Sequence, residues 1–212
     1  MSINGKSGIF NRYFILLFIT SVCFCTATEM NNVVLPLYMT EDLGGTAATM
    51  GLLTSVYTAV SALSRPVNGL LTDRFPRRLV MLVGCALYAL GIFFCGFIPV
   101  MFAAFICRGV QGIGYSAAST ANMAASNDVI PHEHLNEGVG YFGISQTLPA
   151  LFSPLLATTL VTAIGNRSTQ YVIAAFCVVA TILSRFANYD KKAQYAVQSN
   201  KGEKKERGAF IE

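Results

Sequence analysis

Charged residues are scarce in this sequence of 212 residues. Only 12% are Asp, Glu, Lys or Arg, 53% are hydrophobic, and the mean hydropathy is +0.52. Soluble domains carry about 25% charged residues, so this composition excludes a soluble domain with a charged surface. The formal net charge of +4 lies largely in short connections and near the C-terminus. It therefore does not indicate a nucleic-acid partner.

Motifs of catalysis and metal binding are also missing. The sequence contains no His-Glu-x-x-His zinc motif, no nucleophile elbow and no phosphate-binding glycine loop. The cysteines all lie inside apolar stretches, without metal-ligand spacing: Cys23, Cys25, Cys85, Cys95, Cys107 and Cys177. Since a buried free cysteine behaves as a small hydrophobe, we expect packing roles for them. No cofactor, metal or enzymatic activity is expected.

Long apolar stretches dominate what is present. A helix needs about 20 mostly apolar residues to cross a hydrocarbon layer of about 30 Å. Segments of this kind cover residues 13–39, 47–71, 79–98, 100–125, 139–163 and 169–187. The first resembles a signal peptide, but apolar residues resume at 33–37 and five further segments follow. The sequence therefore predicts an all-α integral membrane protein with six transmembrane helices in a lipid bilayer.

Basic residues alternate between the two sides of this predicted bundle. The connections 40–46 and 165–168 and the join near Pro99 contain one basic residue, Arg167. The other side carries Lys6, Arg12, Arg74, Arg77, Arg78 and the basic C-terminal residues. The positive-inside rule then places both termini in the cytoplasm. We expect a multi-pass cell-membrane protein with three parts: a cytoplasmic N-terminus (1–12), a six-helix domain (13–187) and a cytoplasmic tail (188–212).

The connection between the second and third segments contains a glycine followed by a cluster of charges. Its residues are Gly69, Asp73, Arg74, Arg77 and Arg78. In type and spacing they resemble the signature loop of the major facilitator superfamily. Pro76 stands where that loop usually has a second glycine, which puts the usual backbone turn in doubt. An ordinary cytoplasmic loop would explain the arginines, but neither the aspartate among them nor the preceding glycine.

Two further motifs lie in the expected helices. Segment 100–125 contains Arg108, Gln111 and Gly112, which resemble the Arg-x-x-Gln-Gly motif of the same family. Segment 139–163 contains Pro149, Ser153 and Pro154. These resemble a degenerate form of the motif found in proton-driven exporters, with Ser153 in place of the usual glycine. Two prolines five residues apart are expected to kink this helix.

Two opposite charges lie at similar predicted depth inside the membrane. Glu29 is ten residues from Met39 and Arg108 is eight residues from Val100, so they lie about 15 Å and about 12 Å from the outer end. We expect them to form an ion pair that tunes proton binding. The alternatives are a purely structural pair, an arginine held by backbone carbonyls, or a protonated Glu29 bonded to Asn31 or Asn32.

Other polar residues in the spans are expected to line a substrate cavity with this pair. They are Asn31, Asn32, Gln111, Tyr115 and Gln146. Arg65, in the cytoplasmic half of the second segment, is expected to snorkel or to pack against the signature loop rather than to bind substrate.

The resemblance implies the N-terminal six-helix half of a drug/proton antiporter-like member of the family, built from two three-helix repeats. It implies proton-coupled export of a small molecule by alternating access, with a second six-helix half or another copy completing the cavity. We expect the chain to be a fragment, a truncated gene product or a half-transporter. The alternative function is a membrane assembly module that does not transport alone.

The resemblance also implies roles for the acids near the signature loop. Asp73 would face the N-terminus of a helix in the second half, where the helix dipole attracts a carboxylate. Arg77 would pair with Asp128, just after the fourth segment. This second pair lies within the chain itself.

The predicted orientation is testable by cysteine labelling in a cysteine-free background. A membrane-impermeant maleimide added outside the cell should label a cysteine placed at Gly45 and leave one placed at Ser199 unlabelled, because basic residues hold the second site in the cytoplasm. The opposite pattern would overturn the orientation and the depths derived from it.

Overall fold

The computed structural model describes residues 11–98, 100–131 and 134–186, and every regular element in these ranges is a helix. The helices are α1 (Arg12–Glu41), α2 (Ala47–Arg74), α3 (Arg77–Phe97), α4 (Met101–Val129), α5 (Leu135–Ile164) and α6 (Asn166–Phe186). Their bounds differ from the predicted segments by at most four residues. The predicted tail 188–212 and residues 1–10 of the predicted N-terminus lie outside the described residues. The all-α prediction is confirmed.

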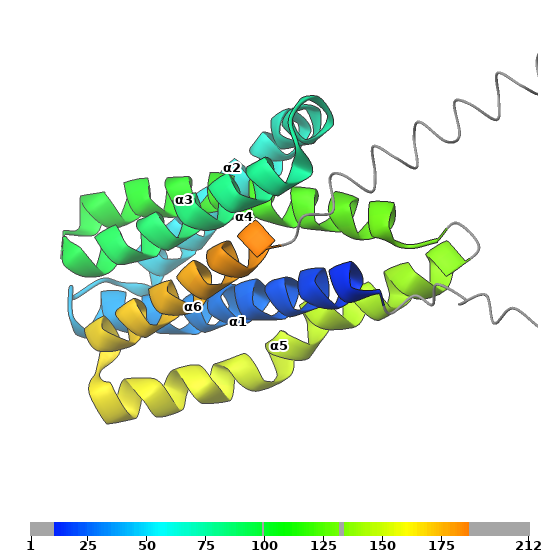
Figure 1. The fold of residues 1–212 in the computed structure, drawn as a ribbon. Coiled ribbons are helices and arrows are strands. Elements are labelled where there is room, and N and C mark those ends of the chain that lie inside the picture. Colours follow the sequence, from blue (N-terminus) through cyan, green and yellow to red (C-terminus); the bar gives the residue numbers. More distant parts are fainter. Residues whose placement is uncertain (1–10, 99, 132–133, 187–212) are drawn as a thin grey trace, which may run out of the picture.

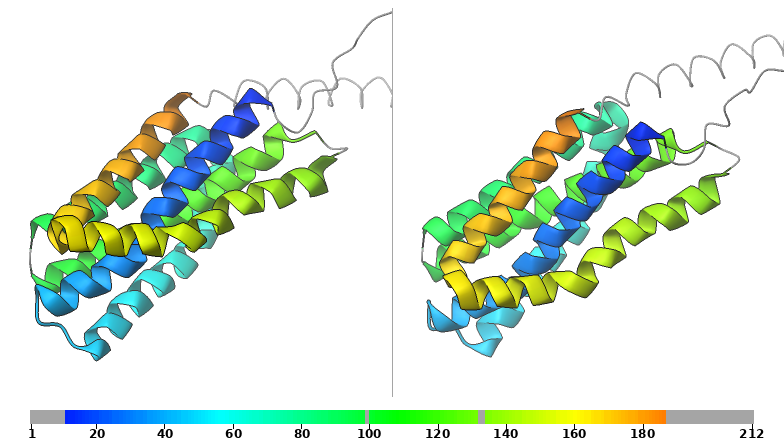
Figure 2. Two further views of the ribbon diagram at one scale, coloured as in Figure 1. Left: turned by 90° about the horizontal axis from the view of Figure 1, so that it is seen from below. Right: turned by 60° about the horizontal axis from the view of Figure 1, so that its bottom comes forward.

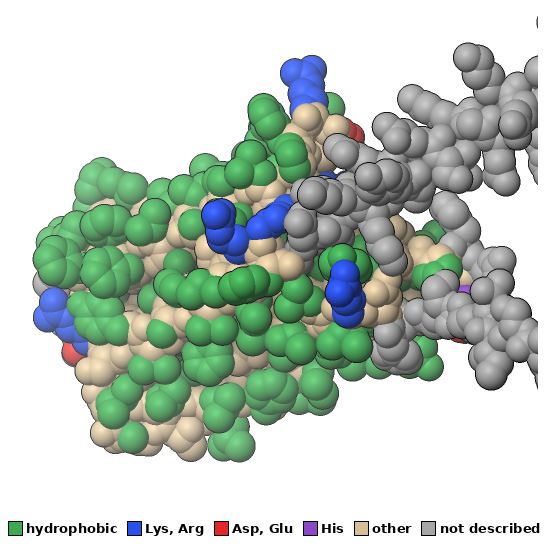
Figure 3. Space-filling view, viewed as in Figure 1, with side chains coloured by type: hydrophobic (Ala, Val, Ile, Leu, Met, Phe, Trp, Pro, Cys, Tyr) green, Lys and Arg blue, Asp and Glu red, His purple; other side chains and the backbone are tan. Residues whose placement is uncertain are grey.

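Length and composition make α1, α2, α3, α5 and α6 candidate membrane spans. The remaining helix, α4, is long enough at 29 residues, but its polar residues lower its hydropathy. Among them are Arg108, Gln111, Asn122 and Ser126, all of which are buried. A helix inside a bundle can carry such residues because protein, not lipid, surrounds them. Hydrophobic side chains cover most of the face drawn in Figure 3, and charged ones are few.

Local chemistry explains where the helices begin and end. The Thr46 hydroxyl accepts a hydrogen bond from the Thr49 amide at 3.4 Å and caps α2. Gly165 ends α5 with a φ of 82°, a conformation that favours glycine. Pro76 precedes α3 with a φ of −53°, which its ring prefers. The proline that departs from the family loop therefore suits a tight α2–α3 connection.

The helix contacts reveal an internal repeat. α1 packs against α5 and α6, and in the same way α4 packs against α2 and α3, while α3 and α6 contact each other. This pattern is unchanged when α1, α2 and α3 are exchanged with α4, α5 and α6. Since each unit has three helices, the second unit starts at the opposite end of the bundle from the first (Figure 1). The chain therefore consists of two inverted three-helix repeats.

Glycines allow α4 to approach its neighbours closely. A Cβ atom at Gly114 would lie 2.7 Å from the Tyr88 amide nitrogen and 2.8 Å from the Gly84 carbonyl oxygen of α3. A Cβ at Gly112 would lie 2.8 Å from the Tyr57 carbonyl oxygen of α2. Small residues at such crossings are a general means of helix association in membranes. They fix α4 between α2 and α3.

By contrast, α2 and α5 are largely uncovered. α2 buries only Leu53, Ser61, Asn68 and Thr72. α5 buries Gly138, Phe142, Ser145, Pro149, Ser153 and Ala157. α5 also bends near its middle (Figure 2), as expected for a helix that contains Pro149 and Pro154. These helices occupy equivalent positions in the two repeats.

The crossing at Gly114 yields a prediction on stability. Gly114→Ala should lower the free energy of unfolding by about 1–3 kcal/mol, because the new methyl group overlaps the α3 backbone. Gly109→Ala is the matched control, since a Cβ there meets nothing within 4 Å and alanine favours helix by about 1 kcal/mol. The stability of both variants is measured by thermal unfolding in detergent. A thiol dye reports unfolding, because it reacts with the buried cysteines as they become exposed. Equal stability of the two variants would contradict the close crossing.

Candidate functional site

A network of buried polar side chains joins α1, α3 and α4. The Asn31 amide nitrogen donates to the Gln111 side-chain oxygen at 3.0 Å and to the Tyr88 hydroxyl at 3.3 Å. The Arg108 guanidinium donates to the same Gln111 oxygen at 3.1 Å. All four side chains are at least 98% buried. Gln111 thus connects two of the residues that the sequence placed in the cavity.

Arg108 is held by uncharged groups. Its guanidinium carbon lies 5.0 Å from the centroid of the Tyr57 ring, within the range of a cation–π interaction. Among the described residues no ion pair joins Arg108 to Glu29. The expected pair is therefore not formed. Matching depth did not bring the two side chains together, because Arg108 turns toward Gln111 and Tyr57.

Glu29 instead lies beside an aromatic cluster. It is half-buried and acts electrostatically on the hydroxyl groups of Tyr57 and Tyr115. Phe24 stacks on Tyr115 with ring centroids 6.2 Å apart, and Tyr57 lies 5.8 Å from Tyr115. Within the described part of the chain Glu29 makes no hydrogen bond or ion pair. Its carboxyl group is therefore available to a proton or to a ligand.

A cavity of about 470 Å³ lies between α2, α4 and α5. Its lining residues are Arg65, Tyr115, Ser119, Thr120, Met123, Ala124, Asn127 and Gln146. Four of them, Tyr115, Ser119, Met123 and Asn127, repeat every fourth residue and form one stripe of α4. This stripe is about 18 Å long at 1.5 Å per residue. It runs from the middle of α4 to the end of the helix near Arg77.

The cavity includes some of the predicted site residues and not others. Tyr115 and Gln146 line it. Glu29 lies within electrostatic range of Tyr115, whereas Asn31, Gln111 and Arg108 are enclosed in the network. Asn32 is exposed and lines no part of the cavity.

Arg65 lines the cavity although the sequence suggested a snorkelling role. The signal that the sequence offered for Arg65 was its place in the cytoplasmic half of a predicted span. Depth alone did not show that the side chain faces α4 and α5 rather than lipid.

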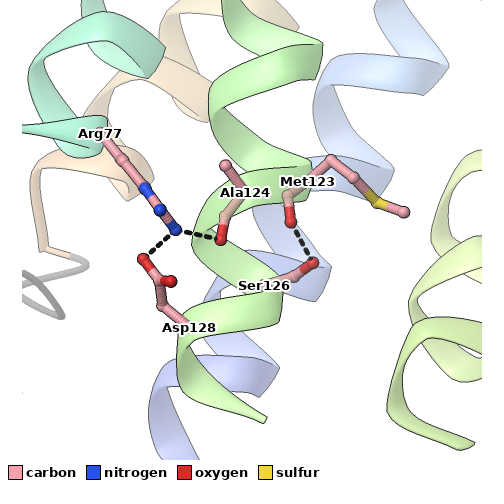
Figure 4. Close-up of polar contacts among 5 residues, drawn as sticks. All are labelled: Arg77, Met123, Ala124, Ser126 and Asp128. Atoms are coloured by element: carbon pink, nitrogen blue, oxygen red, sulfur yellow. Dashed lines mark hydrogen bonds and ion pairs between the residues drawn. The ribbon is translucent and has the colours of Figure 1, made fainter. Parts of the chain in front are cut away.

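At the end of α4, Arg77 and Asp128 form the expected ion pair (Figure 4). The Arg77 guanidinium also donates to the Ala124 carbonyl oxygen at 2.6 Å. Burial raises the pKa of Asp128 above its ordinary value, while the Arg77 charge and hydrogen bond oppose that shift. The pair therefore connects the α2–α3 connection to α4, and the prediction drawn from the family loop is confirmed.

The other residues of the signature loop are more open. Asp73 and Arg74 are exposed, and Asp73 makes no hydrogen bond or ion pair with any described residue. Arg78 donates to the Arg185 carbonyl oxygen of α6. A Cβ at Gly69 would meet nothing within 4 Å. Gly69 and Asp73 are four residues apart and so share one open face of α2.

On α5, Pro149 and Ser153 are buried whereas Pro154 is exposed. One turn away, the Ser145 hydroxyl donates to the Ser21 hydroxyl of α1 at 2.8 Å. This contact ties the bent helix to α1. The helix remains continuous through both prolines.

The sequence of this chain is similar to those of known proteins. Residues 17–209 match the family model described as Major Facilitator Superfamily. The Staphylopine export protein of Staphylococcus aureus is 27% identical over 168 residues, which are 79% of this chain and 42% of that protein. Multidrug resistance protein 3 of Bacillus subtilis is 29% identical over 146 residues, 69% of this chain and 27% of that protein.

A third relative is Multidrug resistance protein MdtL of Klebsiella pneumoniae, 24% identical over 176 residues. This alignment covers 82% of the chain and 44% of that protein. The chain thus spans less than half the length of these curated relatives. Their names describe export and drug resistance, not catalysis.

The buried network predicts unequal effects of two glutamine substitutions. Gln111→Leu should lower the free energy of unfolding by about 1–3 kcal/mol, because Asn31 and Arg108 lose a shared acceptor. Gln170→Leu is the control, since neither side-chain amide atom of the buried Gln170 has a partner among the described residues. It should be neutral or stabilising. Chemical unfolding in detergent micelles measures the stability of both variants. A larger loss of unfolding free energy for Gln170→Leu than for Gln111→Leu would refute the network.

Proposed function

Because this chain belongs to the major facilitator superfamily, we propose that it forms one six-helix half of a secondary transporter. In this proposal, the transporter exports a small molecule from the cytoplasm by alternating access, and proton uptake drives export. The protein lies in the cell membrane with both termini in the cytoplasm.

The observation that carries this proposal is the cavity between α2, α4 and α5. It is polar along Ser119, Thr120, Asn127 and Gln146 and apolar at Met123 and Ala124. Cavities of about 300–1,000 Å³ with few polar groups are typical small-molecule sites. Its stripe on α4 runs to the end that carries Arg77 and Arg78, which the positive-inside rule places in the cytoplasm. A cytoplasmic molecule would enter from that side.

Glu29 is the proposed proton site. It is the acidic residue nearest the middle of a described helix, since Glu41 and Asp42 lie at the outer end and Asp73, Asp128 and Glu137 at the basic end. Its charge is close enough to act on Tyr115, which is a cavity-lining residue, and this supports the assignment. A substrate that enters the cavity would change the electrostatic environment of the carboxyl group. Binding of proton and substrate would thereby be coupled.

The signature loop is the proposed gate. The Arg77–Asp128 pair fixes the α2–α3 connection to the cavity-lining helix α4. Asp73 lies on the same open face of α2 as Gly69. A carboxylate in this position suits the N-terminus of a helix from a second half, where its charge gains about 0.3–1 kcal/mol. Making and breaking this contact would accompany alternating access.

A second six-helix half, or another copy, is proposed to cover α2 and α5. Glycines at which a Cβ meets nothing within 4 Å lie on both helices: Gly51 and Gly69 on α2, and Gly140 and Gly143 on α5. Small residues on an open helix face allow another helix to approach closely. The same faces favour the second candidate function, a membrane assembly module that does not transport alone.

Substitution of Glu29 tests the coupling. Glu29→Gln in the full-length protein should abolish proton movement linked to substrate, because the amide cannot take up a proton. Inverted membrane vesicles loaded with a pH-sensitive dye report this movement after addition of ethidium, rhodamine 6G or fluorescein.

The control for this experiment is Glu137→Gln, which removes an exposed carboxylate near the start of α5 and should behave as wild type. Wild-type proton coupling in Glu29→Gln would place the proton site elsewhere. Absence of transport of every probe by the wild-type protein would favour the assembly module.

A further inference from the structure

Arg65 is exposed, although it lies well inside a candidate membrane-spanning helix. It is nine residues before the end of α2 at Arg74, or about 13 Å from it. Among the residues that the structure describes, it makes no hydrogen bond or ion pair. Its charge is close enough to act electrostatically on Tyr115. The N–H donors of the Arg65 guanidinium are therefore not used by the described residues.

The two arginines inside the spans differ in this respect. Arg108 is 2% exposed and is held by Gln111 and Tyr57. Arg65 instead lines the cavity between α2, α4 and α5. A charged side chain in contact with lipid at this depth is costly, so such residues face a water-filled cavity and mark ligand pathways. Arg108 is used by the fold itself, whereas Arg65 is available to a ligand.

The surroundings of Arg65 suit an anionic group. Among the described residues no acidic side chain lines the cavity, and Arg65 is the charged one that does. Ser119, Thr120, Asn127 and Gln146 supply uncharged hydrogen-bonding groups, and Tyr115 supplies an aromatic ring. A guanidinium presents a planar fork of donors that matches a carboxylate. The carboxyl group of Glu29 acts on Tyr115 as well, but it does not line the cavity.

We propose that Arg65 binds a carboxylate of the transported molecule, and that the substrate class is therefore small amphipathic organic anions, including zwitterions with a carboxylate. The carboxylate lies against Arg65, and the apolar part of the molecule lies against Tyr115 and Met123. The inference rests on the proposed transport function and names its substrate class. It makes Arg65 a specificity-determining residue.

Two dyes with the same xanthene ring system but opposite charge test this assignment. Fluorescein carries a free carboxylate, whereas rhodamine 6G is an esterified cation. Fluorescence anisotropy with the purified full-length protein in nanodiscs measures both dissociation constants without a proton gradient. The wild type should bind fluorescein more tightly than rhodamine 6G. Arg65→Gln should weaken fluorescein binding about tenfold and leave rhodamine 6G binding unchanged or tighter.

Two further variants separate charge from geometry and position. Arg65→Lys should restore part of the fluorescein affinity, because it keeps the charge and loses the fork. Arg185→Gln is the matched control, since it removes an exposed arginine from the end of α6 that does not line the cavity. It should bind both dyes as wild type does. Helical circular dichroism and a single gel-filtration peak verify that each variant is folded.

The outcomes distinguish this inference from the proposed function. Wild-type binding of fluorescein no tighter than that of rhodamine 6G, or unchanged fluorescein affinity in Arg65→Gln, overturns the anion site. If Arg65→Gln binds fluorescein as wild type while wild-type vesicles transport the probes, the anion site fails and transport stands. If fluorescein binding depends on Arg65 in a protein that transports none of the probes, transport fails and the anion site stands.

Discussion

The close approach of α4 to α2 and α3 is the constraint on which the rest of the structure depends. At Gly112 and Gly114, backbone atoms of the neighbouring helices occupy the space where side chains would otherwise lie. This crossing fixes the rotation of α4 about its own axis. Gln111 then accepts a hydrogen bond from Asn31, which also donates to Tyr88, while Tyr115 lies along one side of the cavity. A larger residue at either glycine would displace both sets of contacts.

The polar residues of α4 thus serve two purposes on two faces. One face holds Arg108 and Gln111 in a buried network, in which hydrogen bonds offset part of the cost of burying polar groups. The other face carries the Tyr115–Asn127 stripe along the cavity. The Arg77–Asp128 pair near the end of α4 links this helix to the signature loop.

The inverted repeat gives equivalent helices similar surroundings, but the two helices that pack against the opposite repeat differ in this from the outer ones. α1 and α4 each pack mainly against two helices of the opposite repeat, whereas α2 and α5 lie at the outside of the bundle. No repeat is evident in the sequence, because polar and apolar residues at equivalent positions differ. The helix contacts reveal it, since packing depends on the path of the backbone more than on the identity of each side chain.

The number of helices and their approximate limits could be predicted from the sequence, whereas the sides of the membrane that it predicts remain a prediction. A run of about 20 apolar residues is a local property, and the cost of exposing backbone groups to lipid makes it a helix wherever it is placed. The motif around Asp73 and Arg77 also indicated the family and the Arg77–Asp128 pair. The sequence also predicts how deep each residue lies in the membrane, because each residue adds a fixed rise along the helix.

Which side chains meet could not be predicted from the sequence, because this depends on the packing of the helices. Successive residues of a helix point about 100° apart, so adjacent Asn31 and Asn32 have opposite environments, one buried and the other exposed. Glu29 and Arg108 are predicted to lie at a similar depth, but their side chains do not pair in the structure. Arg65 could be placed in the cavity only once the rotation of α2 against α4 and α5 was known. That rotation comes from contacts between residues far apart in the chain, which the sequence pattern of a single helix does not contain.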